Sequence, residues 1–171
     1  MLDNEKIDMS VPVVKVAPLQ DVPDSFGNPE NLVTATFCEA ECPEFGLVVV
    51  FVMPLEAAQN IIQKILPDSS GEIGEMESSL LMELGNIITG SYLSALSFMT
   101  NLTFNASPPK LGIDMAAAIM GTVIAETKTV DDQLILLNTS LNIESDGIKG
   151  GVLILPDSGS LVTLCEQLGK M

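Results

Sequence analysis

The sequence predicts an α+β fold in which long helices pack on a mainly antiparallel sheet, built by an internal duplication. Two apolar strand candidates each end at a Pro and lead into a helix candidate, and a further long helix candidate lies between these two units. Hydrophobic residues make up 47% of the chain and aromatic residues only 4%, so the core is aliphatic. A chain of 171 residues can bury such a core as a single domain, residues 1–171.

The duplication is read from two hairpins, each followed by a helix. The first unit comprises a strand at 32–39, a turn at 41–45, a strand at 46–54 and a helix at 55–66. The second comprises a strand at 134–143, a turn at 144–149, a strand at 150–156 and a helix at 157–168. Both Pro54 and Pro156 close their strands, where Pro suits the start of a helix.

The repeat extends toward the N-terminus through two similar extended segments, residues 10–16 and 107–113. In the second unit a helix at about residues 76–100 precedes this segment, whereas only nine residues precede it in the first. We therefore expect a first repeat, residues 1–70, that is shortened at its N-terminus and lacks its leading helix. Residues 71–171 form the second repeat, which carries that helix.

The long helix candidate has an apolar stripe and two internal glycines. The predicted core stripe is Leu81, Leu84, Ile88, Ala95 and Met99. Gly85 and Gly90 each cost up to about 1 kcal/mol of helix stability relative to Ala. They indicate either close packing inside the protein or a bare backbone that a partner approaches, and the sequence leaves both readings open.

A shorter helix is predicted at residues 113–126, with Asp114 placed to cap it. Its Ala, Ile and Met content fits a buried packing helix or a Met-rich, adaptable contact surface. The pattern is too weakly amphipathic to choose between them.

The charge excludes several classes of partner. The formal net charge is −16, from 23 acidic and 7 basic residues, and every basic residue is Lys. Such a chain repels phosphate backbones and anionic lipids, so we expect neither nucleic acid nor membrane as a partner. The acidic N-terminus is unlike a signal peptide, and three Cys residues fit a reducing compartment, so a cytoplasmic location is expected.

The residue types also restrict the chemistry. Without any His, Ser-His-Asp and Cys-His catalysis are excluded, and Cys38 with Cys42 cannot complete a tetrahedral N/S metal site unless carboxylates join it. The pair Glu83 and Asn86 remains, three residues apart and therefore on one helix face. Such a pair is often only the solvated face of a helix. Asn is a poor helix former, however, and its amide can hold a water by donating and accepting hydrogen bonds.

These residues carry a family resemblance. The pattern Ser79-x-x-x-Glu83-x-x-Asn86, followed by Pro109, resembles the active-site signature of the CheC/CheX/FliY family, and most closely that of CheC. Members of this family are phosphatases of the phosphorylated chemotaxis response regulator CheY. The likeness covers essentially the whole chain, and the tandem repeat corresponds to the duplicated architecture of the family.

The resemblance implies roles for particular residues. Asn86 would position the hydrolytic water at the phospho-aspartate of CheY, and Glu83 would contact a Lys beside it. Ser79 and Pro109 would support the motif. No cofactor is expected in this chain, because Mg²⁺ would be held by CheY. Asp114 would belong to the segment that binds the receptor deamidase CheD.

Two other functions are kept as alternatives: a non-enzymatic adaptor for CheD, and a flagellar switch domain of FliY type. The resemblance also implies that the helix missing from the first repeat would leave part of the sheet uncovered. We therefore expect self-association into a homo-oligomer that hides the resulting apolar patch.

Overall fold

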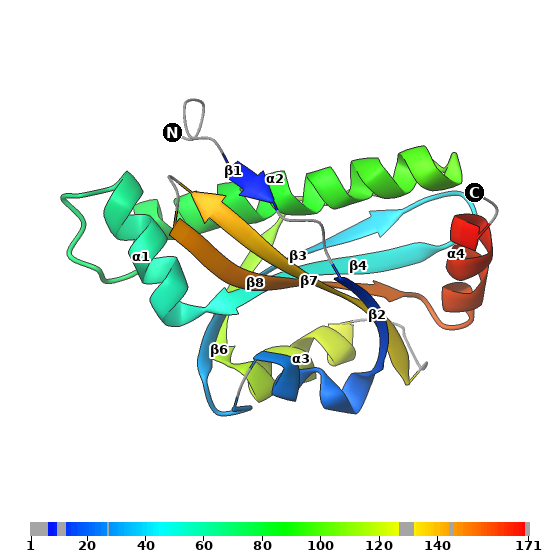
Figure 1. Ribbon diagram of the computed structural model, residues 1–171, viewed down its shortest axis with the longest axis horizontal. Helices are drawn as coiled ribbons and strands as arrows, with labels where there is room; N and C mark the ends of the chain where they lie inside the picture. The colour runs from blue at the N-terminus through cyan, green and yellow to red at the C-terminus, as the bar shows by residue number, and fades with distance from the viewer. Residues whose placement is uncertain (1–6, 10–12, 27, 127–131, 144–145, 170–171) are drawn as a thin grey trace.

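The computed structural model describes residues 7–9, 13–26, 28–126, 132–143 and 146–169, which form an α+β fold as predicted (Figure 1). The strands are β1 (Ile7–Met9), β2 (Val13–Pro18), β3 (Leu32–Glu41), β4 (Gly46–Pro54), β5 (Asn105–Ala106), β6 (Lys110–Met115), β7 (Gln133–Ile143) and β8 (Asp146–Pro156). The helices are α1 (Leu55–Ile65), α2 (Glu75–Thr100), α3 (Ala116–Glu126) and α4 (Ser160–Gly169). Two 3₁₀ turns, η1 (Leu19–Asp21) and η2 (Pro23–Phe26), follow β2.

The strands form one antiparallel sheet in which the two units interlock. The order is β1-β7-β8-β4-β3-β5, while β2 pairs with β7 and β6 pairs with β3. The extended strand of each unit therefore pairs with the hairpin of the other unit. The central contact joins β4 to β8, with Val50 opposite Leu153. The path β2-β7-β8-β4-β3-β6 thus has equivalent strands at equivalent places on either side of its centre.

Helices cover the two faces of this sheet. In Figure 1, α2 runs along one side of the sheet and α3 lies on the other. One core cluster joins α1, α2 and α4 to the sheet through residues such as Val49 and Phe51. The other joins α3 and the η1–η2 region through Val50 and Val52. Because β4 is buried on both faces, its sequence is continuously apolar rather than alternating.

Helix α2 lies closely on β3 at Gly85. Gly85 is buried, and a Cβ atom built there would overlap the side chain of Thr36. One turn further, the Thr89 hydroxyl donates to the Gly85 carbonyl at 2.8 Å. This contact shows that Gly85 serves close packing inside the protein, which was one of its two interpretations.

Both ends of α2 are fixed by local hydrogen bonds. At the N-terminus, the Glu77 carboxylate accepts the Gly74 N–H at 3.0 Å and the Ser69 hydroxyl at 2.6 Å. The Ser69 hydroxyl, followed by backbone N–H groups, lowers the pKa of Glu77 below its ordinary value. At the C-terminus, Asn101 takes the left-handed conformation with φ 56°, which commonly ends a helix.

The prediction of a helix from residue 113, capped by Asp114, was wrong. Residues 110–115 form β6, because β3 offers them an open edge to pair with. Among the described residues, the Asp114 carboxylate accepts only the neighbouring Met115 N–H, at 2.7 Å. The first N–H groups of α3 instead donate to backbone carbonyls, Ala116 to Asn31 at 2.9 Å and Ala117 to Pro29 at 3.0 Å.

The starts of two further elements differ from the prediction. Helix α4 begins at Ser160, because the Asp157 carboxylate accepts the Gly46 N–H at 3.0 Å and the chain turns at Gly159, with φ 78°. Strand β8 begins at Asp146, four residues earlier than predicted, and residues 144–145 of the predicted turn lie outside the described residues.

The core stripe of α2 was predicted correctly only in its first half. Leu81, Leu84 and Ile88 are buried, but Ala95 and Met99 are exposed. Their places in the core are taken by Leu93 and Leu96. The buried face of the helix therefore changes along its length, which a fixed stripe cannot describe.

Replacing Gly85 by Ala should destabilise the fold by about 1–3 kcal/mol, because the added methyl group overlaps Thr36 and moves α2 away from β3. Urea denaturation measures the change in the free energy of unfolding. The control is Gly121→Ala in α3, where no atom lies within 4 Å of the added Cβ, so no loss is expected. Equal stability of wild type and Gly85→Ala would contradict the close contact.

The Glu77 contact should make stability depend on pH. Because the folded-state pKa lies below the ordinary value of 4.5, the contact stabilises the protein above that pH, and this contribution disappears as the pH falls through the folded-state pKa. Wild type should therefore have a higher Tm than Glu77→Gln at pH 7, and the gap should narrow between pH 5 and pH 3. If the difference in Tm stays constant from pH 5 to pH 3, the ionised Glu77 carboxylate is not its source.

Candidate functional site

Glu83 and Asn86 lie on the outer surface of α2. Both side chains are exposed, whereas their neighbours Leu84 and Gly85 are buried. The two residues are three positions apart, which corresponds to about 4.5 Å along the helix axis. The structure therefore brings the predicted pair together on one solvent-facing surface.

Nothing inside the described part of the chain holds these two side chains. Neither the Glu83 carboxylate nor the Asn86 amide forms a hydrogen bond or ion pair with another described residue. The carboxylate keeps its acceptors, and the amide keeps both its donors and its acceptor. This arrangement can bind a cation with Glu83 and orient a water or an oxyanion with Asn86.

The helix surface around the pair carries a small polar side chain and an apolar one. Ser79, one turn before Glu83, is exposed, and its hydroxyl donates to the Glu75 carbonyl at 2.8 Å, so it serves the helix itself. Ile87 is 39% exposed beside Asn86. Ile87 was not among the residues predicted from the sequence.

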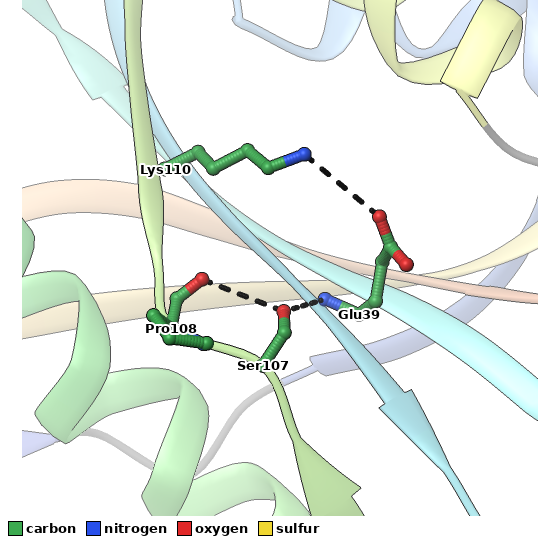
Figure 2. A network of polar contacts seen from close by, with 4 residues as sticks. All are labelled: Glu39, Ser107, Pro108 and Lys110. Atoms are coloured by element: carbon green, nitrogen blue, oxygen red, sulfur yellow. Dashed lines mark hydrogen bonds and ion pairs between the residues drawn. The ribbon is translucent and has the colours of Figure 1, made fainter.

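Pro109 comes from a different element. It is half-buried in the connection between β5 and β6, which runs along β3. Figure 2 shows how this connection is attached: the Glu39 N–H donates to the Ser107 hydroxyl oxygen at 3.0 Å, and Lys110 Nζ lies 3.9 Å from Glu39 Oε1. The Ser107 N–H also donates to the Glu39 carbonyl, at 2.8 Å. The segment thus fixes β6 on β3.

Asp114 is exposed but lies on the opposite face of the sheet. It pairs in register with Val33, which belongs to the core cluster under α3. Directly opposed residues of antiparallel strands point to the same face. Because α2 covers the other face, the structure does not bring Asp114 together with Glu83 and Asn86.

The cysteines do not form a site. Cys38, Cys42 and Cys165 are free thiols, of which Cys38 is buried on β3 and Cys165 is exposed on α4. Burial raises the pKa of Cys38, partly offset by a hydrogen bond with Thr89. Among the described residues, no three His, Cys, Asp or Glu side chains are grouped so that they could hold a metal ion.

A cavity elsewhere in the structure bears on the type of substrate. It has a volume of about 530 Å³ and lies between η1, η2 and α3, lined among others by Leu19, Met120 and Asp132, and neither Glu83 nor Asn86 lines it. The Glu83–Asn86 pair therefore stands on an open helix surface, which suits a macromolecular partner better than an enclosed small molecule.

Within the described ranges, no helix has the length and apolar character needed to span a membrane.

Comparison with known proteins places this helix in a recognised family. A model described as the CheC-like family matches residues 76–113, from the start of α2 into β6. The CheY-P phosphatase CheC of Bacillus subtilis strain 168 is 35% identical over 173 residues, covering 97% of this chain and 82% of that protein.

Solved structures show the same fold. FliY from Thermotoga maritima superposes with a TM-score of 0.69 at 21% identity, over 97% of this chain and 83% of that chain. The FliM middle domain from H. pylori gives a TM-score of 0.59 at 14% identity, over 96% and 82% of the two chains. These matches show a shared fold. The 35% identity to CheC over 97% of this chain establishes that the chain belongs to the CheC-like family.

Proposed function

We propose that this protein is a phosphatase that accelerates hydrolysis of the phospho-aspartate of the chemotaxis response regulator CheY. The observation that carries the proposal is the exposed Glu83–Asn86 pair on α2, whose side chains have no partner among the described residues. The chain is also 35% identical to a relative named as a CheY-P phosphatase.

Asn86 supplies the catalytic amide. Its amide accepts a hydrogen bond from a water and donates one to the phosphoryl group, so that the water oxygen lies in line with the phosphorus–carboxylate bond. The water oxygen bonds to phosphorus while the bond to the aspartate oxygen breaks. The partner's carboxylate leaves, the proton of the water passes to the phosphate, and inorganic phosphate is released. Positioning of this kind needs no covalent intermediate on Asn86.

Glu83 supplies recognition. Its carboxylate, one turn before Asn86, pairs with a Lys beside the phospho-aspartate on CheY. Complementary charge fixes the register of two surfaces and speeds their encounter. The net charge of −16 strengthens this preference for a basic contact surface.

The metal requirement is assigned to the partner. Mg²⁺ bound by CheY would neutralise charge on the transferred phosphoryl group. In this chain Glu83 and Asn86 offer one carboxylate and one amide, which is fewer ligands than an octahedral Mg²⁺ site takes. They are therefore assigned to water and protein contacts.

Other predicted roles stay predictions. An adaptor role toward CheD would use the face that carries Asp114, which is separate from the α2 surface. A flagellar switch role of FliY type, a homo-oligomer and a cytoplasmic location also stay predictions. Exposed apolar side chains such as Phe98 on α2 and Val16 on β2 would support self-association.

Removing the Asn86 amide should reduce assisted dephosphorylation on the order of 100-fold, as expected when one positioned hydrogen-bonding group is lost. The measurement is release of inorganic phosphate from phosphorylated CheY with Asn86→Ala. The matched control is Asn60→Ala, which removes another exposed helical Asn, in α1, and should keep full activity. Full activity of Asn86→Ala would show that the mechanism is wrong.

Reversing the charge at Glu83 should weaken binding of CheY about tenfold, which corresponds to about 1.4 kcal/mol. Glu83→Lys is compared with Glu166→Lys, which makes the same charge change on exposed α4. Affinity for CheY is measured by titration calorimetry at low ionic strength. If both variants lose the same affinity, the effect belongs to net charge and not to a contact at Glu83.

A further inference from the structure

The two glycines inside α2 have different surroundings. Gly85 is buried, and a Cβ atom there would overlap Thr36. At Gly90, a Cβ atom would have no other atom within 4 Å, apart from its chain neighbours and the helix's own backbone. Packing within the described protein therefore explains Gly85 and does not explain Gly90.

Backbone conformation does not explain Gly90 either. The described glycines with positive φ are Gly71 and Gly159, so Gly90 has ordinary helical geometry that Ala adopts more readily. A Gly at this place lowers helix stability, and no described residue lies where a larger side chain would begin.

The position of Gly90 relative to the site suggests what it serves. It follows Asn86 by four residues, so it lies on the same face about 6 Å further along the axis. Gly90 is half-buried, and Ser94, another turn on, is small and exposed. Asn86 therefore borders a part of the helix surface, at Gly90 and Ser94, where the side chain is absent or short.

A helix surface without bulky side chains matters because the side chain that carries the catalytic amide is short. The Asn side chain extends only a few bonds from the helix, and the aspartyl phosphate it must reach sits on an equally short side chain. A larger residue at position 90 would stand at least as high as Asn86. It would hold the partner's backbone away from the helix and the amide away from the phosphate.

We propose that Gly90 is a specificity-determining contact residue, against which the backbone of the aspartyl-phosphorylated partner packs directly. This inference rests on the proposed function, since it takes the partner to be phosphorylated CheY. Gly90 touches the partner and not the reacting atoms, so its role is in binding and approach.

The test compares substitutions at Gly90 with the same substitutions at Gly121, an exposed α3 glycine whose Cβ position is equally open. Ala at either position should raise the Tm, by about 2–4 °C. Gly90→Leu should weaken binding of CheY loaded with Mg²⁺ and beryllium fluoride at least tenfold, and Gly90→Ala should weaken it less. Gly121→Leu should bind as wild type does.

A more stable protein that binds its partner less well is a result that a purely structural role for Gly90 cannot produce. If Gly90→Leu binds loaded CheY with wild-type affinity, the proposal is wrong. If Asn86→Ala is inactive at the same time, the proposed function stands and only the Gly90 contact is wrong. If the wild-type protein does not bind loaded CheY, both fail together.

Discussion

The contact between the bare backbone of Gly85 and the side chain of Thr36 sets both the height and the rotation of α2 on the sheet. A helix residue that faces the sheet directs its neighbours one and two positions away toward the sides and the solvent. Gly85 therefore places Glu83 and Asn86 outward, where both are exposed. A side chain at this position would lift the helix and change the surface it presents. The candidate site is thus defined by packing on the opposite side of its own helix.

Strand β3 carries this constraint into the rest of the fold. It pairs with β4 in its own hairpin and with β5 and β6 of the other unit. The Ser107 and Glu39 hydrogen bonds attach the β5–β6 connection to the same strand. The segment that matches the CheC-like family model, residues 76–113, is therefore anchored to β3 at the Gly85 contact and again where its chain joins β6.

Much of this could be predicted from sequence, because periodicity and turn residues act locally. The hairpins, α1, α2 and the exposed Glu83–Asn86 pair were predicted correctly. The errors arose where a distant segment decided the outcome. Residues 113–115 continued the strand instead of starting a helix because β3 had a free edge, and the Asp157 carboxylate accepted a hydrogen bond from Gly46 instead of opening a helix. Gly85 and Gly90 look alike in sequence, and only the neighbour supplied by β3 distinguishes them. The placement of Asp114 on the opposite face of the sheet from the pair likewise depends on strand register.

In the mechanism proposed above, α2 is held on β3 by the Gly85 contact and presents Asn86 to the phosphoryl group of CheY. The structure of the complex with CheY carrying Mg²⁺ and beryllium fluoride tests this directly. We expect the Asn86 amide to lie within hydrogen-bond distance, about 3 Å, of the position that the attacking water takes in line with the phospho-aspartate mimic. We also expect the CheY backbone to touch Gly90. A complex in which CheY occupies the α3 face, or leaves Asn86 in solvent, would contradict this mechanism.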